Sequence, residues 1–197
     1  MTTGDAHDAD APGDAREAGA AGDAGTGGEG ATGGEGAADV PSAGAKWLLR
    51  PATLADAEEI AFAELELFPD EAWNVFQLAE EIDHPWRRYV VALGEGELLG
   101  YAGIMLAGET ADLHTIGTRR PGVGIGRALL RWCEHAAREA GALSMLLEVR
   151  EDNERARAFY TAAGYTEVGR REGYYRIRGR RIDALVMRRE LPVPSAP

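Results

Sequence analysis

The chain has 197 residues with 21 Lys and Arg against 33 Asp and Glu, and this net charge of −12 is atypical of proteins that bind nucleic acid through a basic face. Its single cysteine, Cys133, excludes an intrachain disulfide and a thiolate metal cluster, and the four scattered histidines lack metal-binding spacing. The apolar runs are too short to span a membrane and the N-terminus does not resemble a signal peptide, so we predict a cytoplasmic protein without a metal.

The charge is uneven along the chain. Residues 1–45 contain 13 Ala and 12 Gly, with nine acids, one Arg and no aromatic residue. Such a segment buries too little apolar surface to offset the backbone entropy lost on ordering, roughly 1–2 kcal/mol per residue. We therefore predict a disordered acidic tail over residues 1–45. Residues 46–197, which hold all the aromatic residues and 20 basic against 24 acidic ones, are predicted to form one domain.

The first half of this domain predicts a strand, two helices and an antiparallel meander. A short apolar run at 46–50, before Pro51, predicts the strand. Helical spacing follows over residues 54–67, and a second, short helix is predicted between Asn74 and His84. Three extended runs separated by glycine-containing turns then predict hairpin-connected strands, at 89–93, 98–106 and 110–118.

The second half alternates between the two patterns. It predicts a helix at 126–140, a strand at 144–150, a helix at 154–163 and strands at 165–170 and 182–190. The predicted fold class is therefore α+β, with a mixed, mostly antiparallel twisted sheet of about seven strands flanked by about four helices.

A glycine-rich stretch, RRPGVGIGR at 119–127, joins a predicted strand to a helix. Glycines let the backbone approach a ligand closely, and a helix start offers free N–H groups with a partial positive charge. Such a turn suits an anion, above all phosphate. The stretch lacks the GK[ST] of a Walker loop and the position of a Rossmann turn, and a plain strand-to-helix turn is the alternative.

Downstream of this turn, Glu148 stands in an apolar strand, and Asn153 opens a helix that carries Tyr160. Together with VGIGRALL at 123–130 and NERARAFYTAAGY at 153–165, these residues resemble the GNAT superfamily of acetyl-CoA-dependent N-acetyltransferases. Within it the chain is more similar to the bacterial RimI-type enzymes, which acetylate the N-terminal alanine of a ribosomal protein. This similarity rests on Phe68-Pro69 with Trp73 and on residues 114–117, 147–150, 173–175 and 183–187, and the resemblance covers essentially residues 46–191.

The resemblance implies acetyl-CoA as co-substrate and no metal. It places the pantetheine arm on Ile116, Gly117 and Thr118, and the pyrophosphate on Gly122, Val123, Gly124, Ile125, Gly126 and Arg127, with a further contact from Asn153. The segment before Gly124 is about two residues shorter than usual, and Pro121 replaces the usual Gln or Arg. Arg119, Arg120 and Arg127 are therefore candidates to compensate.

The resemblance also implies direct acetyl transfer, with Glu148 as general base and Tyr160, twelve residues later, as general acid. A protein N-terminus suits this chemistry, because an α-amino group with a pKa of 7.7–8.0 is about one-tenth neutral at pH 7, against about 0.04% for lysine. A tyrosine hydroxyl, whose ordinary pKa is near 10, can protonate the departing thiolate. The alternative roles are a structural ion pair for Glu148 and core packing for Tyr160.

The expected partner is the N-terminal peptide of a ribosomal protein. By resemblance, Phe68, Trp73, Tyr174 and Tyr175 form the walls of its groove, with Glu66 or Glu71 attracting the positive N-terminus, whereas core packing is the alternative for these aromatics. A small amine or a lysine is the rival acceptor, and a non-catalytic acyl-CoA sensor is the rival class. We expect a monomer or weak dimer with no membrane or direct nucleic-acid contact. Eight arginines between 170 and 189 fit either ribosomal RNA, an acidic peptide or ordinary solvated strand faces.

Overall fold

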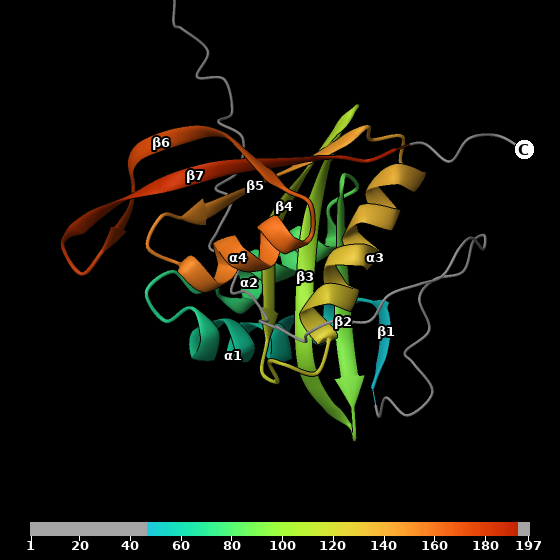
Figure 1. Ribbon diagram of the computed structural model, residues 1–197. Helices are drawn as coiled ribbons and strands as arrows, with labels where there is room; N and C mark the ends of the chain where they lie inside the picture. The colour runs from blue at the N-terminus through green and yellow to red at the C-terminus, as the bar shows by residue number, and fades with distance from the viewer. Residues whose placement is uncertain (1–46, 193–197) are drawn as a thin grey trace, which may run out of the picture.

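The computed structural model describes residues 47–192, so the predicted tail over residues 1–45 lies outside the described part of the chain (Figure 1). The elements are β1 (Leu48–Pro51), the 3₁₀ turn η1 (Leu54–Asp56), α1 (Ala57–Leu67), α2 (Val75–Asp83), β2 (Arg87–Gly94), β3 (Glu97–Ala107), β4 (Thr110–Thr118), α3 (Ile125–Glu139), β5 (Ser144–Arg150), α4 (Glu154–Ala162), β6 (Thr166–Ile177) and β7 (Arg180–Glu190). Between residues 47 and 192, no helix is long and apolar enough to cross a membrane.

The strands form one seven-stranded sheet in the order β1-β2-β3-β4-β5-β7-β6. The β4–β5 pair is parallel, and the other neighbours are antiparallel. The predicted class, a mixed and mostly antiparallel sheet with four helices, is therefore confirmed. The single parallel pair arises because α3 lies between β4 and β5 in the chain and carries it back across the sheet.

Two apolar cores lie on the two faces of the sheet. On β2, Val90 and Ala92 pack with α3 and α4, whereas Tyr89 and Val91 pack with α1 and α2. This alternation follows from the two-residue period of a strand, which points successive side chains to opposite faces. Figure 1 shows α3 and α4 in front of the sheet. Both faces are thus covered by helices.

The first helix begins later than predicted. Residues 54–56 form a 3₁₀ turn, and α1 starts at Ala57 rather than at 54. The Asp56 carboxylate accepts hydrogen bonds from the backbone N–H of Thr53 at 2.7 Å and from the Arg50 guanidinium at 2.6 and 2.8 Å. The hydrogen bonds from Arg50 lower the pKa of Asp56 to about 2. This anchored cap holds the entry to α1 in the tighter turn.

The last hairpin is longer than predicted, because β6 continues past residue 170 to Ile177 and β7 starts at Arg180. The sequence between these points is polar and contains Gly173, which is typical of a loop. In the structure, the Asp183 carboxylate on β7 accepts the Gly173 N–H at 2.7 Å and carries the pairing across an irregularity in β6. Tyr174 and Tyr175 therefore lie on a strand.

Candidate active site

The sheet opens between its two central strands. β4 and β5 pair only from Thr110 with Ser144 to Leu113 with Leu147, although both strands continue. At that point β4 has a bulge, because Leu113 pairs with Ile104 and Thr115 with Gly103, which leaves His114 as the extra residue. A bulge bends its strand, so β4 turns away from β5 here. The opening has Ile116, Gly117 and Thr118 on one side and Glu148 on the other.

The glycine-rich turn lies at the end of β4, where the sequence predicts an anion site. Gly122 and Gly124 both have φ of +85°, a left-handed conformation that glycine adopts without steric cost. Gly124 is the N-cap of α3 and has no side chain to satisfy the first amides of the helix. The N–H groups of residues 125–127, in the first turn of α3, are therefore oriented toward an anion in front of the helix, and phosphate binding there stays a prediction.

The predicted pantetheine strand is tightly packed. A side chain at Gly117 would come within 2.8 Å of Leu67 on α1 and 3.2 Å of Tyr101 on β3. Thr118 donates its hydroxyl hydrogen to the carbonyl of Leu99 and accepts the N–H of Arg120. These contacts fix the backbone of β4 where it leaves the sheet, although they do not test cofactor binding at this strand.

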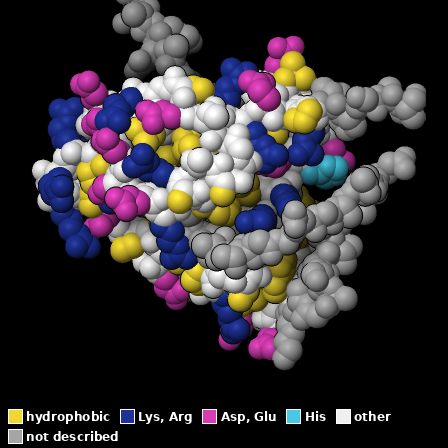
Figure 2. Space-filling model, viewed as in Figure 1, with side chains coloured by type: hydrophobic (Ala, Val, Ile, Leu, Met, Phe, Trp, Pro, Cys, Tyr) yellow, Lys and Arg dark blue, Asp and Glu magenta, His cyan; other side chains and the backbone are white. Residues whose placement is uncertain are grey.

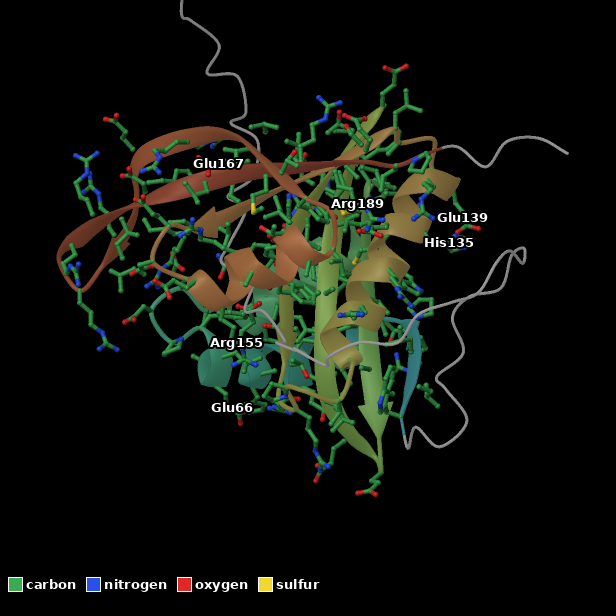
Figure 3. The ribbon with its side chains drawn as sticks, viewed as in Figure 1. Glu66, His135, Glu139, Arg155, Glu167 and Arg189 are labelled. Atoms are coloured by element: carbon green, nitrogen blue, oxygen red, sulfur yellow. The ribbon has the colours of Figure 1, made fainter. Side chains whose placement is uncertain are left out.

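The Arg119 guanidinium is held by hydrogen bonds within the protein. Its Nε donates to Glu66 on α1 at 2.7 Å, and its Nη1 donates to the carbonyl of Leu98 at 3.2 Å (Figure 3 labels Glu66). The expectation that Arg119 compensates for Pro121 at a phosphate is therefore not supported by its contacts. Arg120 and Arg127 are exposed and remain candidates for that role.

Glu148 is the first residue of β5 beyond the paired segment. Its side chain is 8% exposed, and Oε1 accepts a hydrogen bond from Nε of Arg171 on β6 at 2.8 Å. The Arg171 guanidinium also lies 5.3 Å from the ring centre of Tyr174. The structural ion pair considered from the sequence is therefore present. This ion pair holds the Glu148 carboxylate in a fixed orientation beside the opening.

Tyr160 lies on α4 and is fully buried. Its ring makes edge-to-face contacts with Phe159 at 5.2 Å and Tyr165 at 5.7 Å between ring centres. The Asn153 side chain caps α4 by accepting the N–H of Ala156 at 3.0 Å. The predicted second role of Asn153, contact with the cofactor, stays a prediction. Tyr160 packs in the core, as its alternative role requires, and the catalytic role of its hydroxyl stays a prediction.

One ion pair joins the two predicted walls of the acceptor groove. Phe68 and Trp73 are buried at 9% and 7% exposure in the core under α1 and α2. Tyr175 is buried in a small cluster on the β6–β7 hairpin, and Tyr174 packs against it. Asp70, in the loop between Phe68 and Trp73, lies 3.5 Å from Nε of Arg178 at the hairpin tip. The structure therefore brings the two walls together, and most of their aromatic area serves as packing.

The arginines of the hairpin mainly pair with the protein's own carboxylates. Five of the eight form ion pairs: Arg170, Arg171, Arg178, Arg188 and Arg189. Figure 2 shows basic and acidic side chains interspersed over this end of the molecule. Arg189 donates to the buried carboxylate of Glu134 at 2.6 Å, which joins β7 to α3 (Figure 3). This distribution favours solvated, ion-paired strand faces over a nucleic-acid surface.

The buried environment of His114 could not be predicted from the sequence, where this residue counts only among residues 114–117 that support the family similarity. His114, at the bulge, is 1% exposed, and neither ring nitrogen has a hydrogen-bond partner among residues 47–192. Its Nδ1 lies 3.6 Å from Oε2 of Glu81, which also pairs with Arg87. Burial, together with the positive charge of Arg87, lowers the pKa of His114 to about 4. His114 is therefore neutral at pH 7. Only the bulge in β4 brings it into this position.

Metal ligation has no candidate in the described region. Between residues 47 and 192, no group of three or more His, Cys, Asp or Glu side chains is arranged to hold a metal ion.

Comparison with known proteins identifies an acetyltransferase family, in agreement with the resemblance noted from the sequence. Residues 53–165 match the Acetyltransferase (GNAT) family. Over 150 residues the chain is 42% identical to the N-alpha-acetyltransferase RimI of Mycobacterium tuberculosis, covering 73% of this chain and 92% of that protein. It is 32% identical over 144 residues to a Bacillus subtilis protein provisionally named a [ribosomal protein bS18]-alanine N-acetyltransferase, covering 72% and 94% of the two chains. The crystal structure of the ribosomal-protein-S18-alanine N-acetyltransferase from Escherichia coli superposes with a TM-score of 0.68 at 22% identity, over 76% and 96% of the chains.

Proposed function

This chain belongs to the GNAT family of acetyltransferases, and from that premise we propose that it acetylates the N-terminal alanine of a ribosomal protein. Acetyl-CoA is the acetyl donor in this family. The finer assignment of the acceptor is supported by the RimI relative at 42% identity and by the Bacillus subtilis relative, whose name specifies an alanine acceptor.

The observation that carries the proposal is the arrangement around the sheet opening. The anion-binding turn before α3 lies on the β4 side, and the carboxylate of Glu148 lies on the β5 side. The two walls joined by Asp70 and Arg178 border the same end of the sheet. Direct transfer requires donor and acceptor to be bound at once, and this arrangement offers a separate place for each.

The residues present fit the donor. A diphosphate needs backbone N–H groups and positive charge, and the turn offers the amides of residues 125–127 with Arg120 and Arg127 exposed beside them. We assign to this turn the residues Gly122, Val123, Gly124, Ile125, Gly126 and Arg127. The edge of β4 at Ile116, Gly117 and Thr118, which β5 leaves unpaired, is assigned to the pantetheine arm.

The proton balance defines two roles. As the N–C bond forms and the C–S bond breaks, an incoming ammonium group loses two protons, and the thiolate gains one. In the proposed mechanism Glu148 takes the first proton and passes it to solvent, which makes the amine nucleophilic. Tyr160 gives its proton to the thiolate and recovers one from the new amide nitrogen. Each such acid or base contributes typically about 10²–10⁴ in rate.

Direct transfer is favoured over a covalent acyl-enzyme. The one thiol of the chain, Cys133, is fully buried on α3, and burial raises its pKa. A buried neutral thiol is a poor nucleophile, because the thiolate is the reactive form. The acetyl group therefore moves from sulfur to the amine in one transfer.

A peptide assay tests the proposal. The full-length protein is incubated with acetyl-CoA and a peptide that begins Ala-Arg-Tyr, and product is followed by mass spectrometry. The control is the same peptide with a blocked N-terminus and an added lysine. We expect acetylation of the free N-terminus and little of the control. Faster acetylation of the lysine peptide would refute N-terminal specificity, and no turnover with either would support a sensor.

A further inference from the structure

The outer face of α1 and α2 has an apolar groove that the mechanism does not use. The groove has a volume of about 300 Å³ and lies between α1 and the segment that leads into α2. Its lining is mainly apolar and consists of Ala61, Phe62, Leu65, Ala72, Trp73 and Val75, with Glu58 and Asn74 at its margin. It lies beside the acceptor opening, because Trp73 belongs to both.

Large apolar side chains remain exposed along this groove. Phe62 is 56% exposed and Leu65 is 58% exposed, and the two lie three residues apart on the same side of α1. Val75 is 37% exposed, and Phe76, the next residue on α2, is 79% exposed. Water-exposed apolar groups gathered in this way mark a surface that another chain covers.

The same segment carries charge of a single sign. Residues 51–86 contain ten Asp and Glu and no Lys or Arg. Arginines from other segments pair with Asp56, Glu66, Asp70 and Glu81, whereas Glu58, in the lining of the groove, is exposed. An exposed carboxylate in the lining of an apolar groove, on a segment with no Lys or Arg, attracts a partner segment that has both cationic and apolar side chains.

From this arrangement we propose that the groove docks a Lys- and Arg-rich segment with apolar side chains, part of the acceptor protein beyond its N-terminal residues. The proposal rests on the proposed function, and it adds a second contact between enzyme and acceptor. A ribosomal protein fits, because proteins that bind RNA phosphates carry such basic surfaces. A second copy of this chain fits less well, because two acidic faces would meet and repel each other.

The test compares acceptors that differ only beyond the N-terminus. Peptides that begin Ala-Arg-Tyr are extended by a Lys- and Leu-rich, a Glu- and Leu-rich or a Gly- and Ser-rich segment. We expect kcat/KM to be about tenfold higher for the Lys- and Leu-rich peptide than for the Gly- and Ser-rich one at low ionic strength, since about 1.4 kcal/mol of binding corresponds to that factor. High salt should reduce this advantage, because it screens the attraction between Glu58 and the cationic side chains of the peptide.

Matched variants locate the effect. The double variant Phe62→Ser, Leu65→Ser and the charge variant Glu58→Lys should remove the advantage and leave the rate with the unextended Ala-Arg-Tyr peptide unchanged. The controls are Val168→Ser, at 55% exposure on β6, and Glu139→Lys, at 69% side-chain exposure on α3 (Figure 3). Both controls should keep the advantage. The unextended peptide also serves as the check that each variant is folded.

A binding measurement separates this proposal from the proposed function. The Lys- and Leu-rich peptide with an acetylated N-terminus is titrated into the full-length protein by calorimetry, with no chemistry possible. Binding that the groove variants abolish supports the docking site, even if no free N-terminus is ever acetylated. Equal rates for all extensions, or an advantage that survives the groove variants, would overturn it. A wild-type dimer that dissociates in the Phe62→Ser, Leu65→Ser variant would instead assign the groove to a second copy.

Discussion

Acidification should destabilise the fold through His114, because its folded pKa of about 4 lies below the ordinary value of 6.5. The unfolded state then binds more protons than the folded state as the pH falls from 6.5 towards 4, so stability present above pH 6.5 is lost in this window. Full titration corresponds to about 3 kcal/mol, and at pH 5.5 the loss relative to pH 7.5 is about 1.3 kcal/mol.

The groups around this imidazole come from four elements. Glu81 on α2 and Arg87 on β2 pair with each other, Asp112 shares β4 with His114, and Glu148 lies on β5. Arg87 opposes protonation of the ring, and Asp112 and Glu148 favour it. Burial raises the pKa of Asp112, which partly offsets the acid sensitivity of the whole protein. The contribution of His114 must therefore be measured as the difference in pH dependence of stability between wild type and a His114 variant.

Urea unfolding at pH 7.5 and 5.5 provides the assay. The His114→Phe variant should lose about 1.3 kcal/mol less than wild type between these pH values. At pH 7.5 its stability should be similar to wild type, because the substitution removes two buried nitrogens without hydrogen-bond partners among the described residues. His135→Phe, at an exposed histidine, is the control and should behave as wild type. An unchanged pH dependence in His114→Phe would refute the reasoning.

Four further measurements test the assigned roles. Glu148→Gln should lower kcat/KM for the peptide by about 10²–10⁴ at pH 7 without changing KM for acetyl-CoA, and full retention of kcat would exclude it as the base. Tyr160→Phe keeps the buried ring and should lower kcat by a similar factor. Its control is Tyr165→Phe, which loses a hydrogen bond of 3.3 Å to a buried carboxylate. This control should lose about 1 kcal/mol of stability and little activity. Gly124→Ala meets no atom within 4 Å but forces a side chain into positive φ, so it should cost about 1 kcal/mol and raise KM for acetyl-CoA several-fold. Deletion of residues 1–45, proposed to lie outside the catalytic domain, should leave peptide acetylation nearly intact, and a large loss would give the tail a role.

Local patterns predicted most of the elements. β4 and β5 have the predicted bounds, because each is a short apolar run between clear turns. The first turn of α1 and the length of β6 were predicted wrongly. In both cases a carboxylate, on Asp56 or Asp183, accepts a backbone N–H and reshapes the local chain. Short-range propensity does not reveal such bonds, since many carboxylates have no such partner.

The residues of the predicted site also divide into those that the sequence indicates and those that only the structure brings together. The glycines of the turn could be recognised locally, because backbone freedom is a property of glycine itself, whereas Glu148 and Tyr160 were singled out by the resemblance to the GNAT superfamily. The ion-pair partners of the charged groups could not be predicted from the sequence. Arg171 meets Glu148, and Arg119 is taken by Glu66, because the sheet order brings distant segments together.

By itself, the sequence determined the class of fold and the strand-to-helix turn suited to an anion, and its resemblance to the GNAT superfamily pointed to the two residues proposed for proton transfer. The tertiary structure decided where the sheet opens, which side chains border the opening and why His114 is buried in its neutral form. The physical reason is that periodicity is encoded among neighbours, whereas burial and charge pairing depend on which elements pack together. The bulge in β4 is a single-residue register shift, and on it the geometry of the whole opening depends.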